Sequence, residues 1–400
     1  MLLEYSPTLD VLPDNRTMPE KEKIYRIFLS AAEPSADVHC AGLIAAVKKV
    51  RSNVEFVGVG GPKMAAQGCR LLETTVDNAA MIYNAFGQVF HYFMLIRRIS
   101  NFFKTEQIDL AVVCDSPAFN FHVARIAKNR GIKTVFFVAP QLWAWAQWRI
   151  RKLRRLCDKL ICLLPFEKDW FVERGVDAVF VGNPLLDGLS DDLSRYRKQY
   201  LDFDSWNASI AIMPGSRPAE INSLWGPMQQ VALALRRKHP NLTFTAVAVD
   251  DNGKEVLKSL QILSFKCQYT VGSVSSTAAQ SDFAIVASGS ATLQVAAVGC
   301  PMVIMYQTSR VLWHLVGRWL VKTRFLSLVN ILAERELVPE FMPYFSSIEP
   351  IIQSIEQLLA ERDRLAQISG ELIKIAKPMK DTNISGKAAD IVIGMLNAAG

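Results

Sequence analysis

Short apolar runs alternate along the chain with longer stretches that have the apolar spacing of amphipathic helices. In the first half of the sequence the runs cover residues 25–32, 54–61, 110–116, 134–140, 159–165 and 178–184. Nearly continuous apolar strands that alternate with helices are typical of a parallel sheet covered on both faces. The first half is therefore predicted to be a doubly wound α/β domain.

The same pattern starts again after a polar interruption, with apolar runs at 209–217, 243–249, 282–290 and 301–307 and a helical tail from about residue 348. We predict an α/β fold of two Rossmann-like, doubly wound domains with a ligand cleft between them. The predicted divisions are a polar N-terminal extension at 1–24, a first domain at 25–190, a linker at 191–206, a second domain at 207–370 and a C-terminal helical tail at 371–400 that packs back across the domains.

Composition places the chain among globular proteins, since 50% of its 400 residues are apolar and 21% are charged, with a net charge of +7. The seven cysteines form no CxxC pair, which favours reduced thiols in a cytosolic protein. The N-terminal residues are polar, and no apolar stretch reaches the roughly 18 residues of a membrane span. We expect a cytoplasmic protein whose membrane contact, if any, is peripheral.

Small and polar residues follow several predicted strands, at the sheet edge where doubly wound folds bind ligands. They are Glu33–Asp37, Asp115–Pro117 and 140–145 in the first half, and Pro214–Arg217 and Ser288–Thr292 in the second. Helix N-termini attract anions, and the Arg217 guanidinium suits a phosphate. The alternative is that these are only turn and capping residues. There is no P-loop and no GxGxxG after a strand, so no cofactor is expected.

Several longer motifs occur together and in a fixed order. "VGVGGPKMAAQGCRL", "VFFVAPQLWAWAQWRIRKLRRLCDKLICLLPFEKDWF", "MPGSRPAEI" and "SLVNILAERELVPEF" resemble the lipid-A-disaccharide synthase family, from about Ile24 to residue 375. The resemblance implies a glycosyltransferase of the GT-B type that acts in lipid A biosynthesis without a metal. It would move 2,3-diacylglucosamine from UDP to 2,3-diacylglucosamine 1-phosphate, forming a β(1→6) bond with inversion and releasing UDP.

An inverting transfer needs a general base for the acceptor hydroxyl. Asp115 matches the strand-end aspartate of the family and is the first candidate, with helix capping as its alternative role. His39 is the second candidate, because an imidazole titrates near neutrality, although a packed histidine is the more common case. The resemblance implies an acceptor site formed by Glu33, Ser35, Asp37, Trp143, Trp145 and Arg149. It implies a UDP-sugar site formed by Gly215, Ser216, Arg217, Ser288, Gly289, Ser290, Thr292, Gln294, Asn330 and Glu340.

Two stretches suit a phosphorylated, acylated acceptor that lies in a membrane. The tryptophans at 143 and 145 precede a basic run at 149–155, and residues 87–104 have the pattern of an amphipathic helix. The alternative is that the tryptophans fill the core and the basic run is a solvated surface. The expected partners are the UDP-sugar, the acylated glucosamine phosphate and an anionic membrane at the inner face of the inner membrane, with no nucleic acid; the resemblance also suggests a homodimer.

Some positions depart from the family pattern. Ala36, Ala85 and Ala118 replace residues that the family usually has as glycine or as an acidic residue, and Gln294 replaces a glutamate. Two alternatives to the synthase therefore stay open. One is another two-domain UDP-sugar enzyme, such as a 2-epimerase, and the other is a relative that is non-catalytic or uses a different acceptor.

Overall fold

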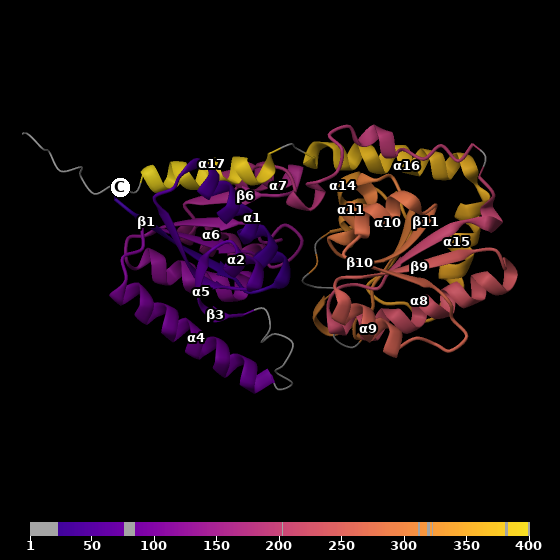
Figure 1. Cartoon of the computed structure of the whole chain (residues 1–400), viewed down its shortest axis with the longest axis horizontal. Helices are drawn as coiled ribbons and strands as arrows, with labels where there is room; N and C mark the ends of the chain where they lie inside the picture. The colour runs from indigo at the N-terminus through magenta and orange to yellow at the C-terminus, as the bar shows by residue number, and fades with distance from the viewer. Residues whose placement is uncertain are drawn as a thin grey trace, which may run out of the picture.

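The computed structural model describes residues 23–75, 85–201, 203–310, 313–317, 321, 323–380 and 383–398. Within them the chain forms two parallel sheets, each covered by helices, which lie in two halves of an elongated molecule (Figure 1). The prediction of an α/β fold with two doubly wound units is confirmed. Of the N-terminal extension, residues 1–22 lie outside the described residues.

The first sheet has the strand order β3-β2-β1-β4-β5-β6-β7. Its strands are β1 Tyr25–Ala31, β2 Val54–Gly60, β3 Cys69–Thr74, β4 Leu110–Cys114, β5 Lys133–Phe137, β6 Lys159–Cys162 and β7 Ala178–Phe180. The helices around it include α1 Pro34–Val50, α2 Pro62–Ala66, α4 Ala85–Thr105, α5 Pro117–Lys128, α6 Ile150–Leu156 and α7 Pro165–Val172. Alternate residues of the central strands enter two separate apolar clusters, as expected of a sheet buried on both faces.

The second sheet has the order β10-β9-β8-β11-β12-β13. Its strands are β8 Ser209–Met213, β9 Thr243–Ala248, β10 Gln268–Val271, β11 Phe283–Ala287, β12 Met302–Met305 and β13 Glu340–Phe341. Helices of this half include α8 Pro218–Lys238, α9 Asp251–Ser259, α10 Val274–Gln280, α11 Ala291–Ala297, α14 Leu328–Ala333, α15 Glu349–Ala360 and α16 Arg362–Ala376. The sequence pattern did not predict β3, β10 and β13, because these edge strands are only partly buried and lack a continuous apolar run.

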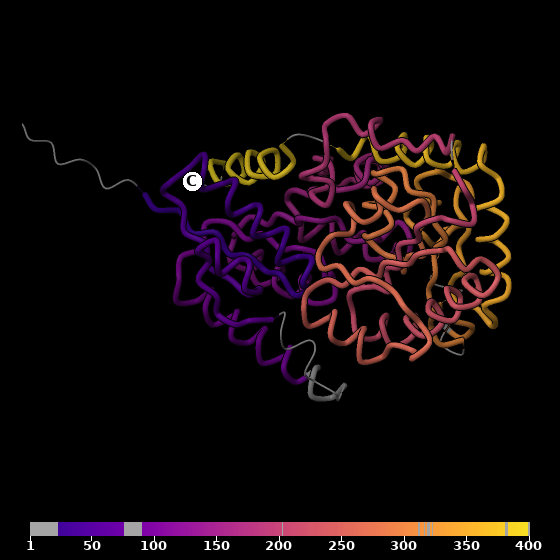
Figure 2. Tube along the Cα trace, turned by 45° about the vertical axis from the view of Figure 1, so that its right-hand side comes forward, coloured from indigo at the N-terminus to yellow at the C-terminus, as the bar shows by residue number. Residues whose placement is uncertain are grey.

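The end of the chain returns to the first half of the molecule. Helix α16 packs on α11 of the second half, whereas α17, Ile384–Asn397, packs along α1 (Figures 1 and 2). The backbone N–H of Asn183 donates to the Met379 carbonyl at 2.8 Å, so the two connections between the halves lie side by side. The chain therefore connects the two halves twice, after β7 and again before α17.

Each sheet reverses its winding at one pair of neighbouring strands. In the first sheet the reversal lies between β1 and β4, and in the second it lies between β8 and β11. A crevice forms outside the carboxyl ends of strands at such a reversal, which is where doubly wound folds bind ligands. The loops after β1 and β4, and those after β8 and β11, are therefore the first places to look for a site.

Candidate functional site

Asp115 and Ser116 form a strained turn directly after β4. Their φ angles are +53° and +39°, in the left-handed region that non-glycine residues rarely adopt. Asn120 on α5 holds this turn, since its Nδ2 donates to the carbonyls of Cys114 at 2.8 Å and Asp115 at 2.7 Å. The hydroxyl of Ser30 on β1 donates in turn to Asn120 Oδ1 at 2.6 Å. Strain maintained by a buried network is characteristic of functional turns.

The charge of Asp115 is unfavourable where it lies. Burial is the main cause that raises its pKa, and the neighbouring Glu33 carboxylate adds to the effect. The Ser116 backbone N–H and the Arg217 guanidinium act in the opposite direction. A carboxylate with a raised pKa accepts a proton more readily than an exposed one, which is the property required of a general base.

Glu33 connects the two halves of the molecule. It precedes α1, and its Oε1 accepts a hydrogen bond from the Ser116 hydroxyl at 2.8 Å. Its Oε2 accepts one from Arg217 Nη2 at 2.7 Å, across the space between the two sheets. The two crevices at the strand reversals therefore face each other, with acidic groups on one side and an arginine on the other.

His39, the second candidate base, is packed inside the first half. Its side chain is 8% exposed, its ring lies 6.1 Å from that of Phe137, and its Nδ1 has no hydrogen-bond partner among the described residues. Burial lowers the pKa of this imidazole to about 4. Such a ring stays neutral at physiological pH and binds a proton weakly, so the geometry favours Asp115 as the base.

Asp37 has a local structural role that the sequence analysis did not predict. Its carboxylate accepts backbone N–H groups of Gly61 at 2.9 Å, Lys63 at 3.0 Å and Met64 at 3.0 Å. It thus caps α2, and its oxygens are already occupied. Ser35, by contrast, is exposed in the first turn of α1, on the same loop as Glu33.

The loop after β8 uses its backbone N–H groups internally. Gly215 has a φ of +103°, and the N–H groups of Ser216 and Arg217 both donate to Glu220 Oε2, at 2.9 and 3.2 Å. The expectation of free amides for an anion at this helix terminus is therefore wrong for these two groups. The Arg217 side chain is 65% exposed and remains the cationic group of the loop.

The loop after β11 is more open. Gly289 and Ser290 are exposed and Ser288 is half-buried, while the buried Thr292 hydroxyl donates to the Gly289 carbonyl at 2.7 Å. Gln294 Nε2 donates to the Leu185 carbonyl at 3.3 Å, a contact with the segment that leaves the first half. Of the residues predicted around this loop, Gly289 and Ser290 are exposed, Ser288 and Gln294 are half-buried, and Thr292 is buried.

Asn330 and Glu340 belong to one buried network. Asn330 Nδ2 donates to the Val338 carbonyl and to Glu340 Oε2, and Asn330 Oδ1 accepts the N–H groups of Leu337 and Val338. Glu340 also accepts the N–H groups of Leu326 and Ser327, at 2.9 and 3.1 Å. These polar atoms are paired within the protein, so they brace the segment before α14 and leave little capacity for a ligand.

The two tryptophans predicted as an apolar wall lie in different environments. Trp143 is 6% exposed and donates its indole N–H to the buried Glu167 carboxylate at 3.0 Å, which is the core position that the sequence left open as the alternative. Trp145 is 37% exposed, and the Arg149 guanidinium lies 5.2 Å from its ring centre. Trp145 also forms a β-bridge with Val321, so this loop reaches the second half.

Burial raises the pKa of Glu167 to about 7, against the lowering effect of its hydrogen bonds from Trp143, Leu164 and Leu163. Asp115 also contributes to this rise. The Asp115 carboxylate thus affects the buried Glu167, a residue that the sequence analysis did not single out.

One face of helix α4 is apolar and exposed. Phe90, Phe93 and Met94 are 67%, 61% and 45% exposed, whereas Leu95 is 1% exposed and belongs to the core. Helix α5 packs against both α4 and α6, and α6 carries the exposed residues Arg151, Arg154 and Arg155. The helices that carry these apolar and basic residues therefore lie on the same side of the first sheet (Figure 1). No described helix is both long and apolar enough to span a membrane.

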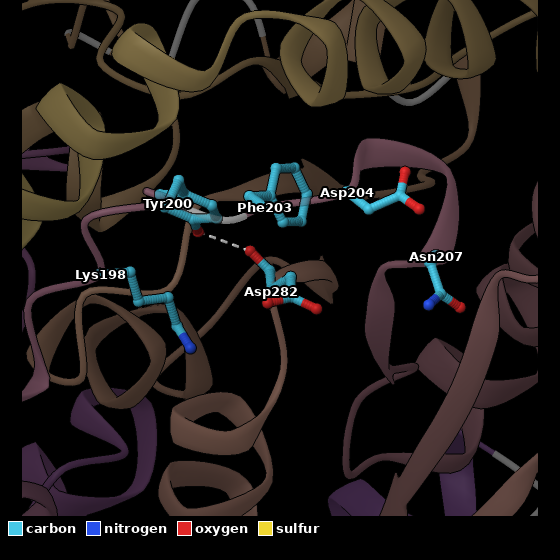
Figure 3. Close-up of a pocket in the computed structure, with 6 residues that line it drawn as sticks. All are labelled: Lys198, Tyr200, Phe203, Asp204, Asn207 and Asp282. Carbon is cyan, nitrogen blue, oxygen red and sulfur yellow. Dashed lines mark hydrogen bonds between the residues drawn. The ribbon is translucent and has the colours of Figure 1, made fainter.

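Two other features of the molecule concern possible sites, a metal centre and a surface depression. Among the described residues, His, Cys, Asp and Glu side chains form no group of three or more that is arranged for a metal ion. Figure 3 shows a polar depression of about 400 Å³ lined by Lys198, Tyr200, Phe203, Asp204, Asn207 and Asp282. Because Asp282 lies just before β11, this depression is at the amino ends of the second sheet, away from the facing crevices.

Two of the departures from the family pattern, Ala36 and Ala118, lie near the starts of helices in the first half. Ala36 is fully buried in α1, where its methyl group is part of the core, and Ala118 is exposed in the first turn of α5. The side chain of Ala85 lies outside the described residues.

Comparison with known proteins identifies relatives over nearly the whole chain. A family model described as lipid-A-disaccharide synthetase matches residues 27–392. The lipid-A-disaccharide synthase of Myxococcus xanthus is 30% identical over 377 residues, covering 93% of this chain and 97% of the relative. Among solved structures, MnaA of S. aureus with UDP matches with a TM-score of 0.60 at 13% identity, covering 93% of this chain and 97% of that one. The calicheamicin glycosyltransferase CalG4 matches with 0.60 at 14%, covering 95% and 100%.

Proposed function

The chain belongs to the lipid-A-disaccharide synthetase family and is a glycosyltransferase, and from this premise we propose the reaction that it catalyses. It transfers 2,3-diacylglucosamine from UDP to 2,3-diacylglucosamine 1-phosphate with inversion. The 6-hydroxyl of the acceptor attacks the anomeric carbon of the donor, the bond to UDP breaks, and a β(1→6) disaccharide forms.

The observation that carries the proposal is the pairing of the two crevices across the molecule. Asp115 lies at the reversal of the first sheet and Arg217 at that of the second, and Glu33 is in contact with Ser116 and Arg217. A base and a cation that face each other suit a displacement in which a proton leaves one side and a diphosphate leaves the other.

The roles follow from this geometry. Asp115 takes the proton of the acceptor hydroxyl. Arg217 and the loop at 288–290 stabilise the negative charge that grows on the diphosphate. The UDP-bound state of the structurally similar S. aureus protein supports a UDP-sugar as the donor.

We propose further that the acceptor is reached from the cytoplasmic surface of the inner membrane, with α4 and α6 against the bilayer. The exposed phenylalanines of α4 are suited to the interface, and the arginines of α6 to anionic headgroups. A homodimer is part of the same proposal and rests on the family alone.

The test is UDP release from UDP-2,3-diacylglucosamine, measured with and without 2,3-diacylglucosamine 1-phosphate. Acceptor-dependent UDP release, with the disaccharide identified by mass spectrometry, is the expected result. Donor consumption that does not require the acceptor would point to an epimerase or hydrolase, and tight UDP-sugar binding without turnover would point to a non-catalytic relative.

A further inference from the structure

The ion pair between Glu33 and Arg217 joins a residue next to the proposed base to the residue proposed to bind the donor. Its atoms are 2.7 Å apart, and the side chains are 34% and 65% exposed, so both remain accessible to a ligand. Arg217 has a second carboxylate partner in Glu220, at a longer 3.4 Å. An incoming diphosphate must therefore compete with Glu33 for the better-placed guanidinium nitrogen.

We propose that Glu33 is a positioning residue that makes proton abstraction by Asp115 depend on donor binding, because the donor diphosphate takes Arg217 from it. This inference rests on the proposed function. In the free protein Glu33 is shared between Ser116 and Arg217. When the diphosphate binds Arg217, Glu33 keeps Ser116 as its partner, and its charge beside Asp115 is no longer compensated by the arginine.

The groups around Asp115 determine the direction of the effect. Glu33 comes from the loop before α1, Arg217 from the start of α8, and Glu167 from α7. Cys114 precedes Asp115 on β4, and Tyr92 on α4 is near Glu33. Of the neighbours outside its own turn, Glu33 raises the pKa of Asp115 and Arg217 lowers it. When a phosphate neutralises Arg217, the raising effect of Glu33 on the pKa of Asp115 is no longer opposed by the arginine. Asp115 therefore becomes a stronger base when the donor is present.

Replacing Glu33 by Gln has opposite effects on binding and turnover, which a purely structural role would not produce. Glu33→Gln frees Arg217, and a partly exposed ion pair of this kind accounts for up to about a fivefold change in affinity. We expect UDP to bind about two- to fivefold more tightly by calorimetry. We expect turnover to fall about tenfold and the acidic limb of the rate–pH profile to move to lower pH.

Three further variants make the experiment specific. In an Arg217→Ala background UDP binds more weakly, and Glu33→Gln no longer changes its affinity. Glu33→Asp, which keeps the charge next to Asp115, restores part of the turnover. Glu106→Gln removes one of the two carboxylate partners of Arg26, an ion pair of 2.6 Å elsewhere on the first half, and leaves UDP affinity and the pH profile unchanged.

Thermal unfolding of each variant shows whether it is folded before its kinetics are compared. If wild-type protein binds UDP but folded Glu33→Gln binds it no more tightly, the inference is wrong while the proposed function stands. The inference is also wrong, with the proposed function intact, if the acidic limb of the rate–pH profile of Glu33→Gln is the same as that of wild type. Wild-type protein that binds neither UDP nor the UDP-sugar would overturn the proposed function and this inference together.

Discussion

At the residue scale, Asp115 combines a strand-end position at the sheet reversal, a left-handed backbone and a raised pKa. If it is the base, Asp115→Asn preserves the shape of the side chain but removes its ability to take a proton. We expect turnover to fall roughly 10²–10⁴-fold. The affinity for UDP, measured by calorimetry, is expected to change little because the diphosphate is proposed to bind in the other half.

The matched control for this variant is Asp177→Asn, which removes a surface carboxylate paired with Lys159 at 2.7 Å. It is expected to leave turnover unchanged. Near-normal turnover in Asp115→Asn, together with complete loss in His39→Ala, would assign the base to His39 instead.

His39 gives the protein a predictable loss of stability in acid. Its folded-state pKa of about 4 lies below the 6.5 of an unperturbed imidazole, so the unfolded chain binds the proton more tightly. The contribution to stability is therefore complete above pH 6.5 and is lost as the pH falls towards 4. At pH 4 this single group accounts for roughly 3 kcal/mol.

Urea unfolding of wild type and His39→Leu at pH 7.5 and pH 4.5 tests this sign. The variant is expected to lose less free energy of unfolding between the two pH values than wild type does. Glu167 has a raised pKa of about 7, so its protonation adds stability as the pH falls and opposes the effect of His39. The test is therefore the difference in stability loss between wild type and variant, and not the pH dependence of either protein alone. Equal losses in both would show that His39 is not charged on unfolding in this range.

At the element scale, α5 fixes the geometry of the candidate base through Asn120. The side chain is fully buried, and its amide group binds two successive carbonyls of the strained turn after β4. Asn120→Ala leaves both carbonyls without their donor, which costs about 1–3 kcal/mol of stability. Because the turn is then free to relax, we expect turnover to fall at least about tenfold while UDP affinity is unchanged.

Asn129→Ala is the control, because Asn129 is an exposed residue just after the end of the same helix. Chemical denaturation and steady-state kinetics of the two variants should differ clearly. If Asn120→Ala loses stability but retains full turnover at a temperature where it is folded, then Asn120 supports the fold and not the base.

The element pattern could be predicted from sequence where burial is nearly complete. Strands β4 and β11 are recognisable as the apolar runs at 110–116 and 282–290 because both faces of the sheet are covered, and the ends of these strands locate Asp115 and the loop at 288–292. The roles of other polar residues depend on partners far away in the sequence. Asp37 is paired with the start of α2, and Glu340 with residues 326 and 327, and no local pattern indicates such pairings.

For Asn120 the sequence indicates a buried polar role. It is a polar residue among apolar ones on the inner face of α5, which indicates a buried hydrogen bond without identifying the partner. For Trp143 the sequence is not informative, because an aromatic residue after a strand looks the same in the sequence whether it lines a cleft or fills the core. Its burial and its contact with Glu167 in the structure distinguish the two.

At the scale of the whole molecule, the first half presents an apolar and a basic surface on the same side. Exposed apolar groups of α4 and exposed arginines of α6 flank α5. Leu95 of α4 does not belong to the apolar surface, because it is in the core. The basic set is also narrower than predicted, since Lys152 is partly buried over the ring of Phe121.

These surfaces predict two separable components of binding to anionic vesicles. Basic residues near anionic lipid contribute about 1 kcal/mol each and are screened by salt, whereas apolar insertion is not. Wild-type protein is expected to sediment with vesicles at low salt and to be partly released at high salt. Reversing the charges of Arg151, Arg154 and Arg155 to Glu should remove most of the salt-sensitive part, and Phe90→Ser with Phe93→Ser should remove the part that remains at high salt.

The control for the charge reversal is the same change at three exposed basic residues of the second half, Arg237, Lys266 and Arg362. This variant has the same net charge as the α6 variant. If it still binds the vesicles, the position of the basic residues determines binding and the total charge does not. Phe90 and Phe93 are exposed, so their replacement should leave the thermal unfolding temperature within a few degrees of wild type. Protein that ignores anionic vesicles at low salt, yet is active on detergent-dispersed acceptor, would contradict the membrane orientation. In that case the apolar face of α4 would have to meet the acyl chains of the substrate or another protein surface, because no described residue of the first half covers Phe90 and Phe93.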